Sequence, residues 1–341
     1  GGTWEFPPEG GSIWRYRAHS PVADSINFGF ESYRMPEGGE LRLLSAGDGS
    51  PLLERAFTSK DNSDSHGELW TPILDDDDVV VEAKLPVGVD PFEMSLVLTA
   101  VNVGYRGFRG RRNGRERARA RRGVRALGGG HNENEERRLS GACNVDVECQ
   151  AGDDWRDEIP SVAVISTSGY LSCSGAMVNN VEQDQKPLFL TANHCGVRKG
   201  NAGSLVAYWN YESSKCGNLP PDGSLTQFTT GSTLLASLSK SDFTLVELDS
   251  KPDSSWGVTY AGWDANAVNA AWAVAIHHPN ADEKSISFEY DPTTTEAAGA
   301  EVRVRDWDLG TTEPGSSGSP LFNQNHHIIG QLWRGSAACD N

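Results

Sequence analysis

The sequence predicts an all-β protein with two folded regions, because short apolar segments recur along most of its length with turns between them. Between residues 12 and 105 apolar and polar residues alternate with a period of two, and clusters of Gly, Pro and Asp separate the segments. This pattern is typical of antiparallel strands. From Cys143 onward short apolar segments and turns follow again, with little helical periodicity. We therefore expect a β-sandwich-like domain over residues 1–105 and a second all-β domain over residues 141–341.

Several strands can be predicted individually. In the first region the alternation is clearest at residues 26–30 and 79–85, and residues 93–103 form a longer apolar run. In the second region we expect strands at residues 162–166, 205–209, 243–248 and 328–332.

A basic arm separates the two regions. Residues 106–140 contain 12 arginines and 4 acidic residues, with few apolar side chains and three consecutive glycines from Gly128 to Gly130. Such a segment cannot bury enough apolar surface to offset its ordering entropy, so we expect it to be disordered and easily cleaved. Nucleic-acid or membrane binding is the alternative interpretation of the arm, and a processing linker is the better one.

The net charge of −17 limits the classes of partner. The two folded regions are acidic, which argues against a nucleic-acid surface because phosphate contacts need clustered Lys and Arg. No apolar run approaches the roughly 18 residues of a membrane span, so we expect no membrane partner. The chain begins at Gly1 and not at Met, and we expect that a leader preceded it.

All six cysteines lie in the second region. An even number confined to one domain predicts disulfides, for which the sequence alone leaves 15 pairings open. No C-x-x-C pair is present, which argues against a zinc site. Disulfides imply an oxidising compartment, so we expect a secreted protein.

The acidic run at residues 75–78 lacks the spacing of a calcium loop, and we interpret it, like Asp61, Asn62 and Asp64, as a solvated turn.

Three segments of the second region carry candidate catalytic residues. They are Thr-Ala-Asn-His-Cys around His194, Ser-Asp-Phe-Thr-Leu around Asp242, and Gly-Ser-Ser-Gly-Ser-Pro around Ser317. A serine hydroxyl is a poor nucleophile and needs an adjacent base, a role that an imidazole with a pKa near 6.5 can perform. A buried carboxylate would hold that imidazole in the required tautomer. The glycines around Ser317 permit a tight turn, which would aim the amides of Gly315 and Ser317 at a developing oxyanion.

On these motifs the sequence resembles the chymotrypsin-like serine proteases, and most closely the bacterial lysyl endopeptidases. The shared stretches are those around His194, Asp242 and Ser317, together with Ala-Ile-His-His-Pro-Asn at residues 275–280. The resemblance covers residues 141–341, and a weaker one relates residues 14–108 to the pro-segment of that group. The order His, Asp, Ser also differs from that of the α/β-hydrolases.

The resemblance implies a chymotrypsin-like double β-barrel, preceded by a pro-domain that acts as a folding aid or an inhibitor. It implies a monomeric endopeptidase that acts on protein or peptide substrates and needs no metal or organic cofactor. It also implies three disulfide pairs, Cys143–Cys339, Cys149–Cys216 and Cys173–Cys195.

The sequence departs from relatives of the family at two places. Animal trypsins pair a new N-terminal ammonium with an Asp just before the catalytic serine, where this chain has Ser316, so we expect no activation of that kind. Trp333, Arg334 and Gly335 occupy the strand expected to line the substrate, where relatives carry His-Gly-Gly, and Arg334 would add positive charge there. The resemblance places the acid that selects a basic P1 side chain beyond Asn341, and Thr311 and Thr312 offer no substitute charge. We expect cleavage after lysine, arginine or both.

The alternative to an enzyme is a non-catalytic secreted binding protein on a protease scaffold, against which the intact triad argues. We interpret His277 and His278 as structural residues at a strand end, and His326 and His327 as part of an exposed turn. The sequence indicates no partner for His19, His66 and His131.

Overall fold

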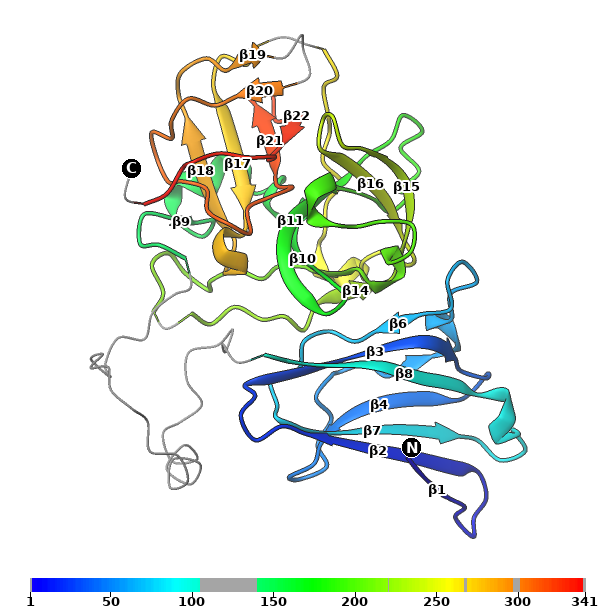
Figure 1. The fold of residues 1–341 in the computed structure, drawn as a ribbon. Helices are drawn as coiled ribbons and strands as arrows, with labels where there is room; N and C mark the ends of the chain where they lie inside the picture. Colours follow the sequence, from blue (N-terminus) through cyan, green and yellow to red (C-terminus); the bar gives the residue numbers. More distant parts are fainter. Residues whose placement is uncertain (1, 105–139, 220, 267–268, 297–300, 340–341) are drawn as a thin grey trace.

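The computed structural model describes residues 2–104, 140–219, 221–266, 269–296 and 301–339, and in these ranges it is built from β-strands and short 3₁₀ turns (Figure 1). Residues 105–139, which include His131 and all of the arginine-rich arm except Ser140, lie outside the described residues. Among the residues that are described, no helix is long and apolar enough to cross a membrane.

The N-terminal domain is a sandwich of two antiparallel sheets. One sheet has the order β1-β2-β7-β4-β5 and the other β6-β3-β8. The strands are β1 Thr3–Glu5, β2 Ser12–His19, β3 Ser25–Arg34, β4 Glu40–Ser45, β5 Phe57–Thr58, β6 Leu69–Trp70, β7 Asp78–Leu85 and β8 Ser95–Gly104. The predicted alternation of residues 79–85 holds, since Val79, Val81 and Ala83 are fully buried between the sheets.

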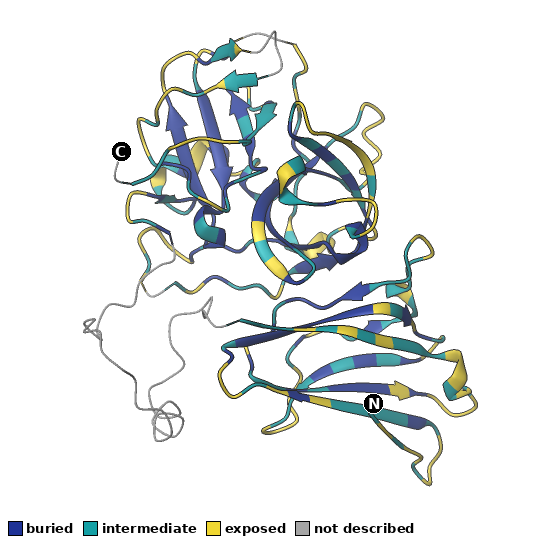
Figure 2. Cartoon of the chain, viewed as in Figure 1, coloured by how far each residue is buried: buried dark blue, intermediate teal, exposed yellow. Residues whose placement is uncertain are grey.

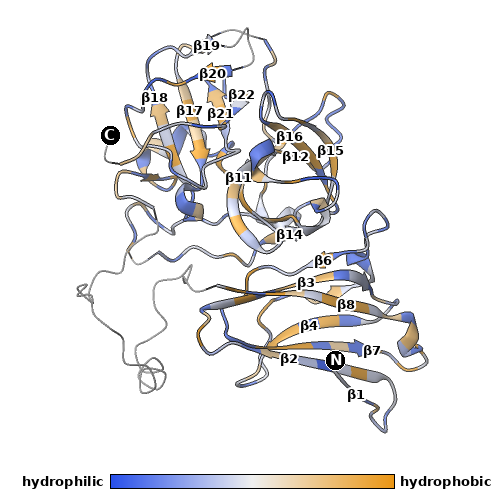
Figure 3. Cartoon of the chain, in the orientation of Figure 1, coloured by the Kyte–Doolittle hydropathy of each residue, from blue (hydrophilic) through white to orange (hydrophobic). Residues whose placement is uncertain are grey.

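The C-terminal domain contains two larger sheets. A seven-stranded sheet with the order β14-β13-β10-β11-β12-β16-β15 curls into the first barrel, and a five-stranded sheet, β22-β21-β17-β18-β9, forms the second half of the domain (Figure 1). Hydrophobic residues concentrate on these strands, while the connecting loops are mostly hydrophilic (Figure 3). This is the all-β, chymotrypsin-like architecture that the resemblance implies.

The predicted strands of this domain occur within one or two residues of their expected positions. The strands are β9 Val145–Asp146, β10 Val162–Thr167, β11 Tyr170–Val178, β12 Leu188–Ala192, β13 Val206–Tyr208, β14 Phe228–Thr230, β15 Ser232–Leu238, β16 Phe243–Leu248, β17 Ala273–His277, β18 Ser285–Glu289, β19 Thr294–Glu296, β20 Glu301–Arg303, β21 Pro320–Asn323 and β22 Ile328–Gln331. The short pair β19-β20 forms a separate ribbon. Strands β17 and β18 are buried along their whole length (Figure 2).

Strand β10 is buried on both faces, which explains why its sequence does not alternate. Ala163 and Ile165 belong to the core of the first barrel, whereas Val164 belongs to a cluster shared with the N-terminal domain. Strand β13 is divided in the same way, with Ala207 inside the barrel and Tyr208 in the shared cluster. The N-terminal domain therefore covers the outer face of the first barrel (Figure 1).

Polar contacts fix the position of the N-terminal domain on this face. The Ile73 amide donates to the Tyr208 hydroxyl at 3.1 Å, and the Thr230 hydroxyl donates to the Trp70 carbonyl at 2.6 Å. The side-chain amide of Asn27 donates to the carbonyl of Gly169 at 2.8 Å.

His66 has a partner across the interface, contrary to the sequence-based expectation. Its Nε2 lies 2.8 Å from Oδ2 of Asp249, and its Nδ1 accepts the amide N–H of Glu68 at 3.0 Å. Nδ1 is therefore unprotonated, and Nε2–H donates to the carboxylate. His19 also lies near a carboxylate, with Nδ1 3.5 Å from Oδ2 of Asp78.

The acidic turns of the N-terminal domain are more structured than expected. Asp76 is only 5% exposed, and its carboxylate accepts the amides of Asp77 and Asp78. Asp61 pairs with Arg55 at 2.7 Å, and Asn62 bonds both the N–H and the C=O of Met35. The interpretation as solvated turns was therefore wrong for Asp76, Asp61 and Asn62, because their side chains bond the backbone or an arginine.

Replacement of Phe228 should weaken the docking of the two domains. Its ring is buried, lies 6.2 Å from the Phe57 ring and packs under the Arg55 guanidinium. We expect Phe228→Ala to lower the free energy of unfolding of the full chain by about 3 kcal/mol or more, as other buried Phe→Ala changes do. The control Leu235→Ala, at a side chain that is 44% exposed, should change it by less than about 0.5 kcal/mol. Equal effects of the two variants in denaturant unfolding would show that Phe228 is not part of a stabilising interface.

Candidate active site

Two neighbouring strands bring His194 and Asp242 together. Strand β12 ends at Ala192, which is paired with Phe243 at the start of β16, so the residues that follow β12 meet those that precede β16. His194 lies in the 3₁₀ turn Asn193–Cys195, and the Asn193 amide donates to the Asp242 carbonyl at 2.7 Å. Asp242 has a φ of 53°, in a region that Asp and Asn enter more readily than other non-glycine residues.

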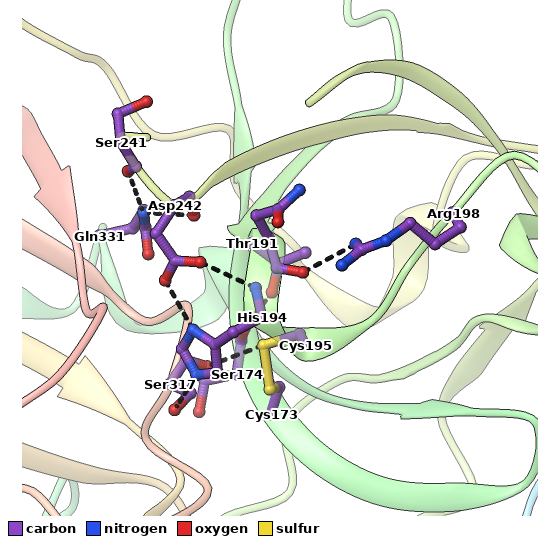
Figure 4. A network of polar contacts seen from close by, with 11 residues as sticks. Cys173, Ser174, Thr191, His194, Cys195, Arg198, Ser241, Asp242, Ser317 and Gln331 are labelled. Atoms are coloured by element: carbon purple, nitrogen blue, oxygen red, sulfur yellow. Dashed lines mark hydrogen bonds and ion pairs between the residues drawn. A yellow bond between two sulfur atoms is a disulfide. The ribbon is translucent and has the colours of Figure 1, made fainter. Parts of the chain in front are cut away.

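His194 bridges a buried carboxylate and a serine hydroxyl (Figure 4). Its Nδ1 lies 2.6 Å from Oδ2 of Asp242, and its Nε2 lies 2.7 Å from Oγ of Ser317. The His194 amide also donates to Oδ1 of Asp242 at 2.8 Å, so both carboxylate oxygens are engaged. The Asp242 side chain is 3% exposed and the His194 side chain 40%. Since a carboxylate can only accept, Nδ1 carries the proton and the Nε2 lone pair faces the Ser317 hydroxyl.

The turn that carries Ser317 is held against the first barrel. The Ser174 amide, on β11, donates to the Ser317 carbonyl at 2.8 Å, and the Ser174 hydroxyl donates to the Gly315 carbonyl at 2.9 Å. Gly315 and Gly318 have φ values of 95° and 82°, and a Cβ atom on either would collide with neighbouring backbone. Only glycine fits these two positions without strain.

The amides of Gly315 and Ser317 are available to an anion. Within the described residues neither donates to a protein acceptor. Two unpaired N–H groups beside a nucleophile can stabilise an oxyanion, and each such donor is typically worth about 3 kcal/mol in the transition state.

The structure contains all three disulfides that the resemblance implies. Their Cα–Cα distances are 5.4 Å for Cys143–Cys339, 4.5 Å for Cys149–Cys216 and 6.1 Å for Cys173–Cys195. The last pair joins β11 to the turn of His194. In the described part of the chain, the one cluster with metal-ligating atoms close together consists of Cys173, Cys195 and His194, and the disulfide removes both thiolates from it.

The start of the C-terminal domain also contacts the nucleophile turn. The amide and the hydroxyl of Ser140 donate to Oδ2 of Asp282 at 3.0 and 2.9 Å. The Gly141 amide and the Asn144 side chain donate to Oε2 of Glu313 at 2.9 and 2.8 Å. Glu313 lies four residues before Ser317. Residues 140–144 are therefore connected by hydrogen bonds to the segment that leads into the nucleophile turn. No motif in the sequence pointed to a role for Asp282 or Glu313.

Trp333, Arg334 and Gly335 line an open cavity of about 1170 Å³, which Thr311 and Thr312 also line. The Arg334 guanidinium lies 4.1 Å from the centre of the Trp333 ring and 3.2 Å from a carboxylate oxygen of Glu301. The positive charge that Arg334 brings to this cavity is therefore paired with the carboxylate of Glu301 on β20.

The remaining histidines have defined surroundings. His277 and His278 are fully buried; burial lowers the pKa of His277 to about 3 and is the main cause that holds the pKa of His278 well below its usual value. His326 is not simply exposed as expected, since its ring stacks on Trp155 with centroids 4.1 Å apart and its Nδ1 lies 3.0 Å from Glu158. His327 is exposed.

Comparison with known proteins places the chain in a family. Residues 138–341 match the family model of the lysyl endopeptidase C-terminal domain, and residues 3–102 match that of the lysyl endopeptidase N-terminal domain. The chain belongs to the lysyl endopeptidase family. It is 27% identical to the lysyl endopeptidase of Pseudomonas aeruginosa, over 98% of this chain and 71% of that protein. The inactive form of the Rv3671c protease is a solved structure that covers 53% of this chain, with 82% of its own residues matched, 14% identity and a TM-score of 0.32. Family membership supports peptidase activity.

A fluorophosphonate should label this lysyl endopeptidase family member at Ser317. We expect Asp242→Asn to slow labelling by about 10⁴-fold, because the wrong tautomer of His194 then faces the serine. His194→Ala should slow it comparably, and Ser317→Ala should abolish it. Ser319→Ala is the matched control, since its buried hydroxyl has no hydrogen-bond partner among the described residues, and it should label as the wild type does. Labelling of Ser317→Ala at the wild-type rate would refute the assignment.

Proposed function

We propose that the chain is the proenzyme of a secreted, trypsin-like serine endopeptidase that cleaves peptide bonds after basic residues. The observation that carries the proposal is the hydrogen-bonded series from Asp242 through His194 to Ser317, with distances of 2.6 and 2.7 Å. Acyl transfer by a serine nucleophile needs this arrangement of acid, base and hydroxyl. The three disulfides support secretion, because such bonds persist in oxidising compartments.

In the proposed mechanism, Ser317 Oγ attacks the peptide carbonyl while His194 Nε2 takes the hydroxyl proton. Asp242 stabilises the imidazolium that forms, and the amides of Gly315 and Ser317 bind the oxyanion of the tetrahedral intermediate. His194 then gives its proton to the leaving amine, which breaks the peptide bond and leaves an acyl-enzyme on Ser317. Water, deprotonated by His194, hydrolyses this ester. No metal or organic cofactor is required, and we expect a monomer that acts on protein or peptide substrates.

We further propose that residues 1–105 act as a folding aid or inhibitor of the protease domain. Their contacts with Val164, Tyr208 and Phe228 support a role in folding, because strands β10 and β13 acquire a buried outer face only when this domain is docked. The contacts lie on the first barrel, at the side of β10, β13 and β14 (Figure 1).

The arm suggests which basic residues the enzyme accepts. No lysine lies between Lys84 and Lys186, whereas the arm ends in Arg137 and Arg138. A cut after either arginine would leave the contacts of Ser140 and Gly141 with Asp282 and Glu313 in place. If the enzyme matures itself, its pocket must therefore accept arginine, which needs more room than the compact ammonium of lysine.

N-terminal sequencing of the matured protein tests this specificity. The complete gene product would be expressed with Ser317 intact and as Ser317→Ala, and as a matched control with both Arg137 and Arg138 changed to Lys. We expect cleavage after an arginine only in the active form, together with hydrolysis of arginyl peptides. Identical processing of the Ser317→Ala variant, with turnover of lysyl but not arginyl peptides, would contradict it. Faster self-processing of the lysine control would show a preference for lysine.

A further inference from the structure

His277 is a fully buried histidine that the proposed mechanism does not use. It ends β17, and both ring nitrogens have serine partners: Nδ1 lies 2.8 Å from Oγ of Ser316, and Nε2 lies 3.0 Å from Oγ of Ser287. Ser316 immediately precedes the nucleophile Ser317 and is itself fully buried. The ring therefore links β17 and β18, in the second half of the protease domain, to the turn that carries Ser317 and the oxyanion amides.

The proton positions in this network follow from the remaining hydrogen bonds. The Ser287 hydroxyl has one hydrogen, which it donates to the Thr311 carbonyl at 2.7 Å, so its oxygen must accept from Nε2–H of His277. Nδ1 is then unprotonated in the neutral ring and accepts the hydrogen of the Ser316 hydroxyl. The Ser316 oxygen in turn accepts the amide N–H of Glu313 at 3.2 Å. Every polar atom of the three side chains thus has a partner of the required kind.

The neutral form of His277 is the one that this network requires. Burial lowers the pKa of His277 to about 3, so the ring is uncharged at neutral pH. Protonation of Nδ1 would place its N–H opposite the O–H of Ser316, so that neither group would have an acceptor there. Within the described structure, the network connects Thr311, Glu313 and Ser316 to strands β17 and β18, and so holds one side of the turn.

We infer that His277 and Ser316 are positioning residues, which hold the Gly315–Ser317 turn in its catalytic shape through a neutral histidine–serine hydrogen bond. Ser316 occupies the sequence position at which animal trypsins carry the Asp that pairs with a new N-terminal ammonium, and its bond to His277 is present in the uncleaved chain. The inference rests on the proposed function, since it assigns these residues to the same acyl-transfer site.

Ser316 is placed where it can control the alignment of the two oxyanion amides. Ser316 lies between Gly315 and Ser317, whose amides would bind the oxyanion, and the first-barrel side of the turn is fixed by Ser174. Loss of the Ser316 hydroxyl would remove the hydrogen bond that holds the turn to His277 on β17, and would leave the bonds to Ser174 in place. The His194–Ser317 hydrogen bond does not involve Ser316, so the base should stay in place while the two amides lose their alignment.

Kinetics of Ser316→Ala, with Ser319→Ala as the matched control, tests the inference. Both changes delete a buried hydroxyl of the same turn, but that of Ser319 has no hydrogen-bond partner among the described residues. We expect Ser316→Ala to lower kcat about 10- to 100-fold with KM changed less than about 3-fold, as for partial loss of an oxyanion donor. The affinity for a peptide aldehyde, whose hemiacetal oxygen occupies the oxyanion site, should fall in the same proportion. Binding of the amine-side peptide product, which has no oxygen in the oxyanion site, should not change, and the pH profile should keep the limb that reports His194.

A second measurement does not depend on turnover. In ¹⁵N-histidine NMR of the uncleaved Ser317→Ala chain, His277 should be the neutral Nε2–H tautomer from pH 4 to 8, and Ser316→Ala should shift its Nδ1 resonance. A protonated ring or the Nδ1–H tautomer would overturn the inference, as would a kcat of Ser316→Ala equal to that of Ser319→Ala. A matured wild-type protein that is neither labelled nor active would refute the proposed function, and the tautomer of His277 would then test the hydrogen-bond network independently of activity.

Discussion

The catalytic geometry depends on one junction between the two halves of the protease domain, at Ser174. This residue is fully buried on β11, and its amide and hydroxyl bond the carbonyls of Ser317 and Gly315. Its hydroxyl oxygen also accepts the amide of His278, from the second half, at 3.0 Å. His194 and Asp242 belong to the first barrel and Ser317 to the second half, so a hydrogen-bond distance between them requires this contact. The adjacent Cys173–Cys195 disulfide holds the turn of His194 to the same strand.

The N-terminal domain imposes a second constraint on the first barrel. Strands β10 and β13 bury apolar side chains on both faces, which is common in covered sheets but unusual for antiparallel strands that face water. Val164, Tyr208 and Phe228 would be exposed without that domain, and the exposure of several such side chains would cost several kcal/mol at about 25 cal/mol per Å². The barrel and the N-terminal domain therefore stabilise each other, while the triad lies at the junction of the two halves.

The sequence was sufficient to predict the all-β class, several of the strands and the residues that meet at the candidate site. The strands were predictable because a period of two indicates a half-buried strand. The candidate site was predictable because each of its three residues lies in a short contiguous motif. It was not sufficient for contacts between segments far apart in the chain. The pairing of His66 with Asp249, 183 residues away, leaves no local pattern. The stacking of His326 on Trp155 and the ion pair of Arg334 with Glu301 were missed for the same reason, since each depends on the packing of segments far apart in the chain.

The catalytic residues are already assembled in the uncleaved chain, because the hydrogen bonds from Asp242 through His194 to Ser317 are present before any cleavage. Proton NMR of the His194 Nδ1–H tests it most directly, because a hydrogen bond to a buried carboxylate moves that resonance far downfield. In the uncleaved Ser317→Ala protein we predict one such resonance, which Asp242→Ala abolishes and which stays in place after an added protease cuts the arm. A resonance that is absent from the uncleaved chain and emerges only after cleavage would contradict the account.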